Sequence, residues 1–169
     1  MEAQMENGTN RSYQDLEAWR EAMALAEMVY KATDSFPKNE QFGLTIQARR
    51  AAASIPANLA EGQGRQAHAD FRRFVQISRG SLSELETHLL LAMRLGFLKR
   101  EQLIPIWEKS QITGRLINGL IRSLSKRIAA KKSGYRLPAT GYRSTPPSSS
   151  PAPADGSEPF HGAAAHFPA

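Results

Sequence analysis

The sequence predicts an all-α protein, an antiparallel up-down-up-down four-helix bundle followed by a disordered C-terminal tail. Apolar residues recur at three- and four-residue spacing in four consecutive segments, which is the period of an amphipathic helix. The links between these segments are short, so consecutive helices should run antiparallel. Seven of the ten prolines follow Leu137, in a stretch that has no apolar period.

The first predicted helix runs from about Tyr13 to Thr33. Its apolar positions are Leu16, Trp19, Met23, Ala26, Val29 and Tyr30. Ser12 followed three residues later by Asp15 resembles a capping box. The segment 34–37 ends in proline and should end the helix, because the residue before a proline avoids the α region.

The second predicted helix runs from about Glu40 to Glu61, with Asn39 as its N-cap. The glycines of the segment 62–64 should stop it, and Pro56 should kink it because proline removes one hydrogen bond. One face carries Leu44, Ala48, Ala51, Ile55 and Leu59, and a nearly opposite face carries Ile46, Ala53, Ala57 and Ala60. A helix that is apolar on two sides is usually buried on both, so we expect a second copy of the chain against the alanines.

A polar stripe runs between these two faces of the second helix. It consists of Gln47, Arg50, Ser54, Asn58, Glu61 and Arg65. One interpretation is a structural network in which Arg50 and Glu61 satisfy each other or nearby backbone, since such residues are rarely buried unless paired. The others are a ligand or RNA site on Arg50, Asn58 and Arg65, or an interface between copies.

The third predicted helix, from about Ala67 to Leu95, has the clearest apolar stripe. The stripe consists of Phe71, Phe74, Val75, Ser78, Leu82, Leu85, Leu89, Ala92 and Leu95. Gly96 is a suitable residue to end this helix, and Gly80 near its middle should permit a close helix contact. The fourth helix runs from about Arg100 to Lys131. Its apolar face carries Leu103, Ile106, Trp107, Ser110, Ile117, Leu120, Leu124 and Ile128.

Three parts of the chain are therefore expected: a flexible N-terminus (1–12), the bundle (13–132) and a disordered tail (133–169). The tail is rich in Pro, Ser and Ala and cannot bury enough apolar surface to offset its ordering entropy. The chain has no cysteine, and its longest apolar run is far shorter than a membrane span. We therefore expect a cytoplasmic protein that contains neither disulfides nor membrane helices.

The positive charge of the chain lies in its bundle. The net charge is +6, and residues 15–132 hold 19 basic and 12 acidic side chains. In the fourth helix no acidic residue follows Glu108. The predicted nucleic-acid contacts are Arg115, Arg122, Lys126 and Arg127 of this helix, with Arg72, Arg73 and Arg79 of the third. Such side chains would bind phosphates with little reading of bases.

No catalytic or metal-binding pattern is present in the sequence. The four histidines form no pair with helical metal-ligand spacing, and Glu84 and Glu86 point in different directions on a helix. The segment Gly62–Gly64 follows a helix rather than a strand and lacks the lysine of a phosphate-binding loop. We therefore expect no enzyme activity, no metal and no cofactor.

An ordered series of short motifs resembles the four-helix bundle proteins related to the 23S rRNA intervening-sequence protein. The motifs span about Tyr13 to Leu124. They are Asp15-Leu16 with Trp19, Phe36-Pro37, Glu40, Gly43-Leu44, Gln47, Arg49-Arg50-Ala51-Ala52, Ser54-Ile55-Pro56, Asn58-Leu59-Ala60-Glu61-Gly62, Gly64-Arg65, Phe74, Arg79-Gly80-Ser81, Glu84-Leu85-Glu86 and Leu95-Gly96. Leu59 replaces a usual isoleucine, and Ala67 replaces the serine or threonine that usually caps helix three.

The resemblance implies an up-down-up-down bundle and a ring-shaped homo-oligomer, with a pentamer as the expected form. Some members are encoded within insertions of 23S rRNA genes, and a related bundle assists the reverse transcriptase of diversity-generating retroelements. No catalytic residues are recognised in these proteins. The leading hypothesis is a non-catalytic, homo-oligomeric bundle that associates with RNA. The alternative is a protein-interaction adaptor or scaffold for a nucleic-acid enzyme such as a reverse transcriptase.

Overall fold

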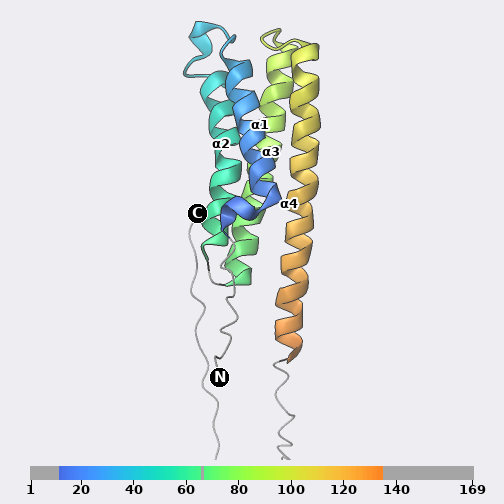
Figure 1. The fold of residues 1–169 in the computed structure, drawn as a ribbon. Coiled ribbons are helices and arrows are strands. Elements are labelled where there is room, and N and C mark those ends of the chain that lie inside the picture. Colours follow the sequence, from blue (N-terminus) through green and yellow to red (C-terminus); the bar gives the residue numbers. More distant parts are fainter. Residues whose placement is uncertain (1–11, 66, 135–169) are drawn as a thin grey trace, which may run out of the picture. The chain divides into compact units, whose positions relative to one another are not determined.

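The computed structural model describes residues 12–65 and 67–134 (Figure 1). Within these ranges the chain forms four α-helices and no strand: α1 (Glu17–Thr33), α2 (Leu44–Gln63), α3 (His68–Arg94) and α4 (Arg100–Gly134). Helix α1 packs against α2 and α4, and α3 packs against the same two helices. The predicted four-helix bundle is therefore confirmed. Most of the predicted flexible N-terminus and nearly all of the predicted tail lie outside the described residues.

The start of the first helix differs from the prediction. The capping box of Ser12 and Asp15 is present, but it caps a 3-10 turn, η1 (Tyr13–Asp15). Leu16 is then extended, with φ −72° and ψ 118°, and α1 begins only at Glu17. The box thus lies on a separate turn ahead of α1. The predicted end at Thr33 is confirmed.

The start of α2 also differs, because Asn39 does not cap it. Residues 38–40 form a second 3-10 turn, η2 (Lys38–Glu40), and α2 begins four residues later than predicted, at Leu44. The Glu40 carboxylate accepts the backbone N–H of Leu44 at 2.8 Å, so a longer side chain does the capping. Helix α2 then continues through the buried Pro56 without a break.

The turn between α3 and α4 follows the prediction for Gly96. Gly96 has φ 76°, and the N–H groups of Phe97 and Leu98 both donate to the carbonyl of Ala92. Glycine adopts this left-handed conformation without a steric penalty. Leu95 was predicted in the core, but it follows the last helical residue and is 53% exposed. At the other end of α3, Ala67 supplies no side-chain cap.

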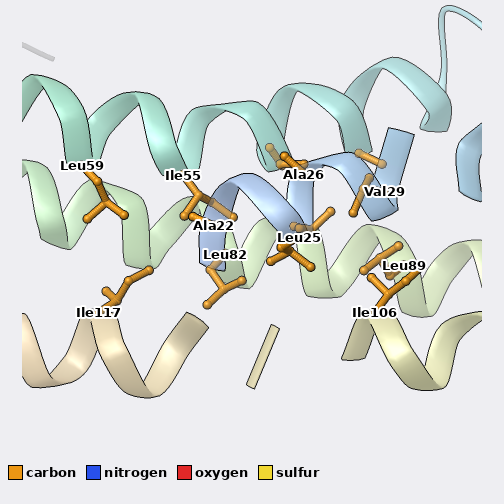
Figure 2. Close-up of a cluster of buried hydrophobic side chains, with 14 of the residues drawn as sticks. Ala22, Leu25, Ala26, Val29, Ile55, Leu59, Leu82, Leu89, Ile106 and Ile117 are labelled. Carbon is orange, nitrogen blue, oxygen red and sulfur yellow. The ribbon is translucent and has the colours of Figure 1, made fainter. Parts of the chain in front are cut away.

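The core is a single apolar cluster to which all four helices contribute (Figure 2). Leu25 of α1, Ile55 of α2, Leu82 of α3 and Ile117 of α4 are all fully buried. The predicted face of α1 is partly wrong, since Met23 and Tyr30 are 37% and 45% exposed. The positions that α1 buries are Ala18, Ala22, Leu25, Ala26 and Val29. Helix α1 is therefore turned so that its small residues face the core.

Two glycines on helices have opposite surroundings. A Cβ built on Gly62 would lie 2.7 Å from the Cβ of Phe74 and 2.8 Å from Cδ2 of Phe71, so α2 and α3 approach closely there. A Cβ built on Gly80 would meet no atom within 4 Å, and Gly80 is exposed. The prediction that Gly80 permits close packing is therefore wrong, and Gly62 has that role.

Replacing each glycine with alanine should change stability in opposite directions. Gly62→Ala should lower the free energy of unfolding by about 1–3 kcal/mol, because the new methyl group overpacks the contact between α2 and α3. Gly80→Ala should raise it by about 0.5–1 kcal/mol, because alanine loses less backbone entropy in a helix. Urea denaturation followed by circular dichroism measures both. Equal effects of the two substitutions would contradict the assigned packing.

Candidate nucleic-acid interface and apolar face

The packing order of the helices places two pairs on opposite sides of the bundle. Each helix contacts its two neighbours in the order α1, α2, α3, α4, and α4 closes the arrangement against α1. The surface shared by α1 and α2 therefore lies opposite the surface shared by α3 and α4. The two surfaces carry different side chains.

The outer side of α4 is basic. Arg115, Arg122 and Lys126 are exposed and lie away from the buried Ile117 and Leu124. Within the described residues none of the three has an ion-pair or hydrogen-bond partner. Their charges are thus available to a ligand in solution.

Two arginines of α3 lie beside these α4 side chains. Arg72 donates to the Ser125 hydroxyl at 3.5 Å, and Gln111 donates to Glu86 at 3.2 Å. These contacts set the antiparallel register of the two helices, which brings Arg79 level with α4 between Arg115 and Arg122. We call the cluster of five cations the basic face. It consists of Arg72, Arg79, Arg115, Arg122 and Lys126.

The remaining two predicted contacts do not join the basic face. Arg73 is exposed on α3, but it is one residue beyond Arg72 and so points about 100° away around the helix. Arg127 lines a hollow at the end of the bundle together with Leu16 and Phe71. Each of the two follows a cation of the basic face by one residue, so the helix period turns it away, and the tertiary structure shows what surrounds it.

The middle of the polar stripe of α2 forms a network against α3. The hydroxyls of Ser54 and Ser81 lie 2.9 Å apart, and the Asn58 amide donates to the backbone carbonyl of Ser54 at 2.8 Å and to its hydroxyl at 2.9 Å. Glu61 pairs with Arg65 at 2.6 Å, so the predicted pair of Arg50 with Glu61 is not formed. The network interpretation therefore accounts for this part of the stripe.

The first two residues of the stripe are different. Gln47 and Arg50 are exposed and have no partner within the described part of the chain. Arg65, at the other end, also lies over the Phe74 ring, 5.2 Å from its centroid. The centre of the stripe is thus a hydrogen-bonded contact with α3, and its start is exposed to solvent.

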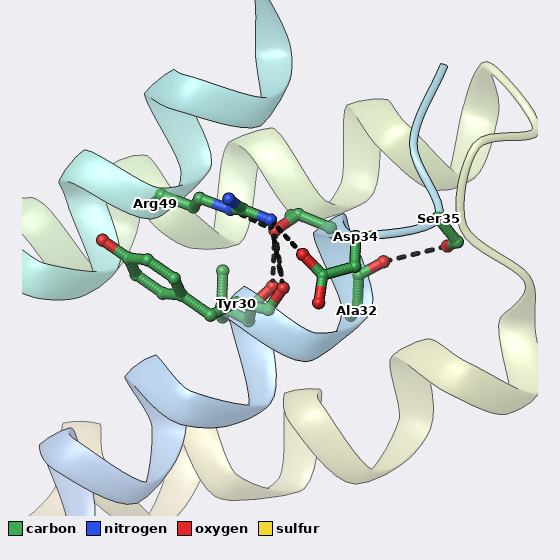
Figure 3. A network of polar contacts seen from close by, with 7 residues as sticks. Tyr30, Ala32, Asp34, Ser35 and Arg49 are labelled. Atoms are coloured by element: carbon green, nitrogen blue, oxygen red, sulfur yellow. Dashed lines mark hydrogen bonds and ion pairs between the residues drawn. The ribbon is translucent and has the colours of Figure 1, made fainter. Parts of the chain in front are cut away.

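Sequence reasoning missed the role of Arg49. Its guanidinium donates to Asp34 at 2.7 Å, to the Thr33 hydroxyl at 2.8 Å and to the Tyr30 carbonyl at 3.3 Å (Figure 3). It also lies 5.0 Å from the centroid of the Tyr30 ring. A cation at a helix C-terminus satisfies carbonyls that lack helical partners. Arg49 thus links α2 to the end of α1, and no local sequence signal indicates this because the contacts join residues 15–19 positions apart.

The surface shared by α1 and α2 is mostly apolar, although Glu27, Lys31 and Asp34 also line it. Trp19, Met23 and Tyr30 of α1 face the alanines of α2 across an open groove of about 670 Å³. The alanines are Ala53, Ala57 and Ala60. We call these six residues the apolar face. Near one end of it, Ile46 is 39% exposed and Phe42 is 87% exposed.

Comparison with known families agrees with this architecture and with the motifs. The sequence model of the 23S rRNA-intervening sequence protein family matches residues 14–119. The chain belongs to this family. The residues that match the family model cover α1, α2, α3 and the first half of α4. They therefore include the apolar face and part of the basic face.

A solved structure is similar to this intervening-sequence family member over most of the bundle. It is a protein of unknown function of the S23 ribosomal protein family from Bacteroides thetaiotaomicron. The two chains are 26% identical, with a TM-score of 0.56, and the match covers 62% of this chain and 97% of the other. Among curated proteins no match is found.

The described residues hold no group of three acidic or histidine side chains that could bind a metal ion. In the same ranges, none of the helices is long and apolar enough to cross a bilayer.

Proposed function

We propose that this protein is a non-catalytic, cytoplasmic homo-oligomer that associates with RNA through phosphate contacts. The observation that carries the proposal is the placement of an apolar face and a basic face on opposite sides of one bundle. If each apolar face packs against a different surface of the next copy, the copies can close into a ring and their basic faces stay free. An assembly then repeats the cations once in each subunit and strengthens the field that attracts a polyanion.

The chemistry of the basic face favours phosphates over bases. Its five cations are four arginines and one lysine, and Arg115, Arg122 and Lys126 have no partner within the described ranges. The exposed aromatic residues of the described ranges are Tyr13, Tyr30 and Phe42, and none of them lies on α3 or α4. The basic face therefore offers charge without rings on which bases could stack.

The apolar face favours a second copy of the chain. Alanines at Ala53 and Ala57 are exposed and small, so another backbone can approach α2 closely. The larger Met23 and Tyr30 flank them and supply apolar area. The family resemblance implies a ring, with five subunits as the expected number.

The salt dependence of RNA binding tests the proposal on the wild-type protein. We expect the affinity for a labelled 20-base-pair RNA duplex to fall linearly with salt on a double-logarithmic plot. A contribution of about 0.9 per phosphate contact gives a slope of about −4.5 if all five cations of one subunit take part. Fluorescence anisotropy between 50 mM and 500 mM salt measures it. The absence of salt-sensitive binding near physiological ionic strength would overturn the proposal.

A second candidate function is a scaffold for a nucleic-acid enzyme such as a reverse transcriptase. One observation favours it: Leu90, Leu91, Leu95 and Ile104 are 38–53% exposed near the turn between α3 and α4. This apolar patch is not part of the apolar face. Recovery of a stoichiometric protein partner after nuclease treatment, lost in Leu91→Glu, would support the scaffold and not RNA association.

A further inference from the structure

Two hollows adjoin at the end of the bundle where α3 begins. The first, of about 310 Å³, lies between η1, the end of α2, the start of α3 and α4. The second, of about 510 Å³, lies between the start of α3 and the last turns of α4. His68 and Arg127 line both hollows, so the two adjoin at these side chains.

The first hollow combines an apolar floor with a charged rim. Leu16 and Leu120 are half-buried and contribute apolar surface, and the buried Phe71 and Leu124 complete the apolar part of the lining. Its volume falls within the range of small-molecule sites, roughly 300–1,000 Å³. A flat apolar ring would therefore be covered there more fully than on the open basic face.

The cations of the rim differ in their availability. Arg65 is paired with Glu61, and the one acid of the first hollow, Asp15, accepts the Ser12 N–H and lies 3.7 Å from Arg20. His68 and Arg127 are exposed and have no partner within residues 12–65 and 67–134. These two side chains can therefore bind an anion without breaking an existing ion pair.

The second hollow continues the positive charge. Lys131 and Lys132 line it beside Ile128, and both are exposed on the part of α4 that extends beyond the start of α3 (Figure 1). No acidic side chain lines this hollow. If a nucleic-acid backbone runs from the first hollow past His68 and Arg127, its next phosphates would thus lie near two further cations, Lys131 and Lys132.

We propose that this site binds an unpaired nucleotide of an RNA strand, with the base on the apolar floor and its phosphate between His68 and Arg127. The inference rests on the proposed association with RNA and adds a site that distinguishes single strands from duplexes. Unpaired bases can enter a pocket, whereas bases in an A-form duplex cannot. The basic face should bind both forms alike, because both present phosphates.

The test uses the full chain with a labelled single-stranded RNA octamer and a blunt duplex of the same sequence. Ser123→Trp fills the first hollow from an exposed position without changing charge, and Gln47→Trp places the same side chain on an exposed position of α2 outside both hollows and the basic face. Arg127→Gln removes a rim cation, and Arg73→Gln removes one cation elsewhere.

We expect Ser123→Trp and Arg127→Gln each to weaken octamer binding about tenfold, which is the effect of one lost base contact. Each should weaken duplex binding less than threefold. Both controls should change the two affinities alike and less than threefold.

The outcomes separate this inference from the proposed function. Octamer binding by Ser123→Trp at the wild-type affinity would overturn the nucleotide site and leave the basic face intact. Failure of the wild type to bind either RNA would overturn both. A parallel titration with AMP, read from the His68 ring protons by NMR, identifies the source: shifts without octamer binding would mean a free nucleotide and contradict the RNA strand. Displacement of the octamer by an oligoglutamate peptide at equal charge would contradict a site for bases.

Discussion

Replacing Arg115, Arg122 and Lys126 together with glutamine should remove most of the salt-sensitive affinity for RNA. These three cations of the basic face are exposed and unpaired within the described residues. Loss of three contacts should flatten the salt slope by about 2.7, at about 0.9 per contact. Near 0.1 M salt, one decade below 1 M, this corresponds to a loss of roughly 10²–10³-fold in affinity. Anisotropy titrations at several salt concentrations measure both quantities.

A control with the same change in net charge separates the basic face from bulk charge. Lys38, Lys99 and Arg100 are exposed and lie at the links of the bundle, away from the basic face. Their joint replacement with glutamine should change the salt slope by less than one unit. If both triple variants lose affinity equally, the attraction depends on net charge alone and the basic face is not an interface.

Replacing Ala57 with glutamate should dissociate the assembly into monomers. Ala57 is an exposed residue of the apolar face, so the new carboxylate stays solvated in a monomer. In an interface that covers the apolar face it would be buried without a partner, which costs several kcal/mol per subunit. Light scattering at micromolar concentration should therefore report a multiple of 18.7 kDa for the wild type and 18.7 kDa for the variant.

The fold of the monomer serves as the internal check on this result. Glutamate is a good helix former, so the helical circular dichroism of the variant should match that of the wild type. Ala130→Glu places the same charge on an exposed position of α4 outside the apolar face and should leave the mass unchanged. A monomeric wild type, or an unchanged mass for Ala57→Glu, would contradict the apolar face as the contact between copies.

The sequence by itself determined the helices, because the signals that define them are local. The apolar period of α3 and the glycine after its end predicted His68–Arg94 within about one residue, and Gly96 has the expected positive φ. The motifs that identify the family lie within these same segments. The positive charge of α4 was also visible in the sequence, since charge needs no partner to be counted.

Only the tertiary structure decided how each helix is turned and which side chains meet. Local spacing could not show that α1 buries Ala18 and Ala22 and leaves Met23 at the surface, because that depends on the helices that pack against α1. Arg127 was grouped with Arg122 only as a candidate nucleic-acid contact, and the structure shows that it lines the end hollow. A helix period specifies angles around one axis, whereas a face or a site requires the register between two axes, which arises only when the helices pack.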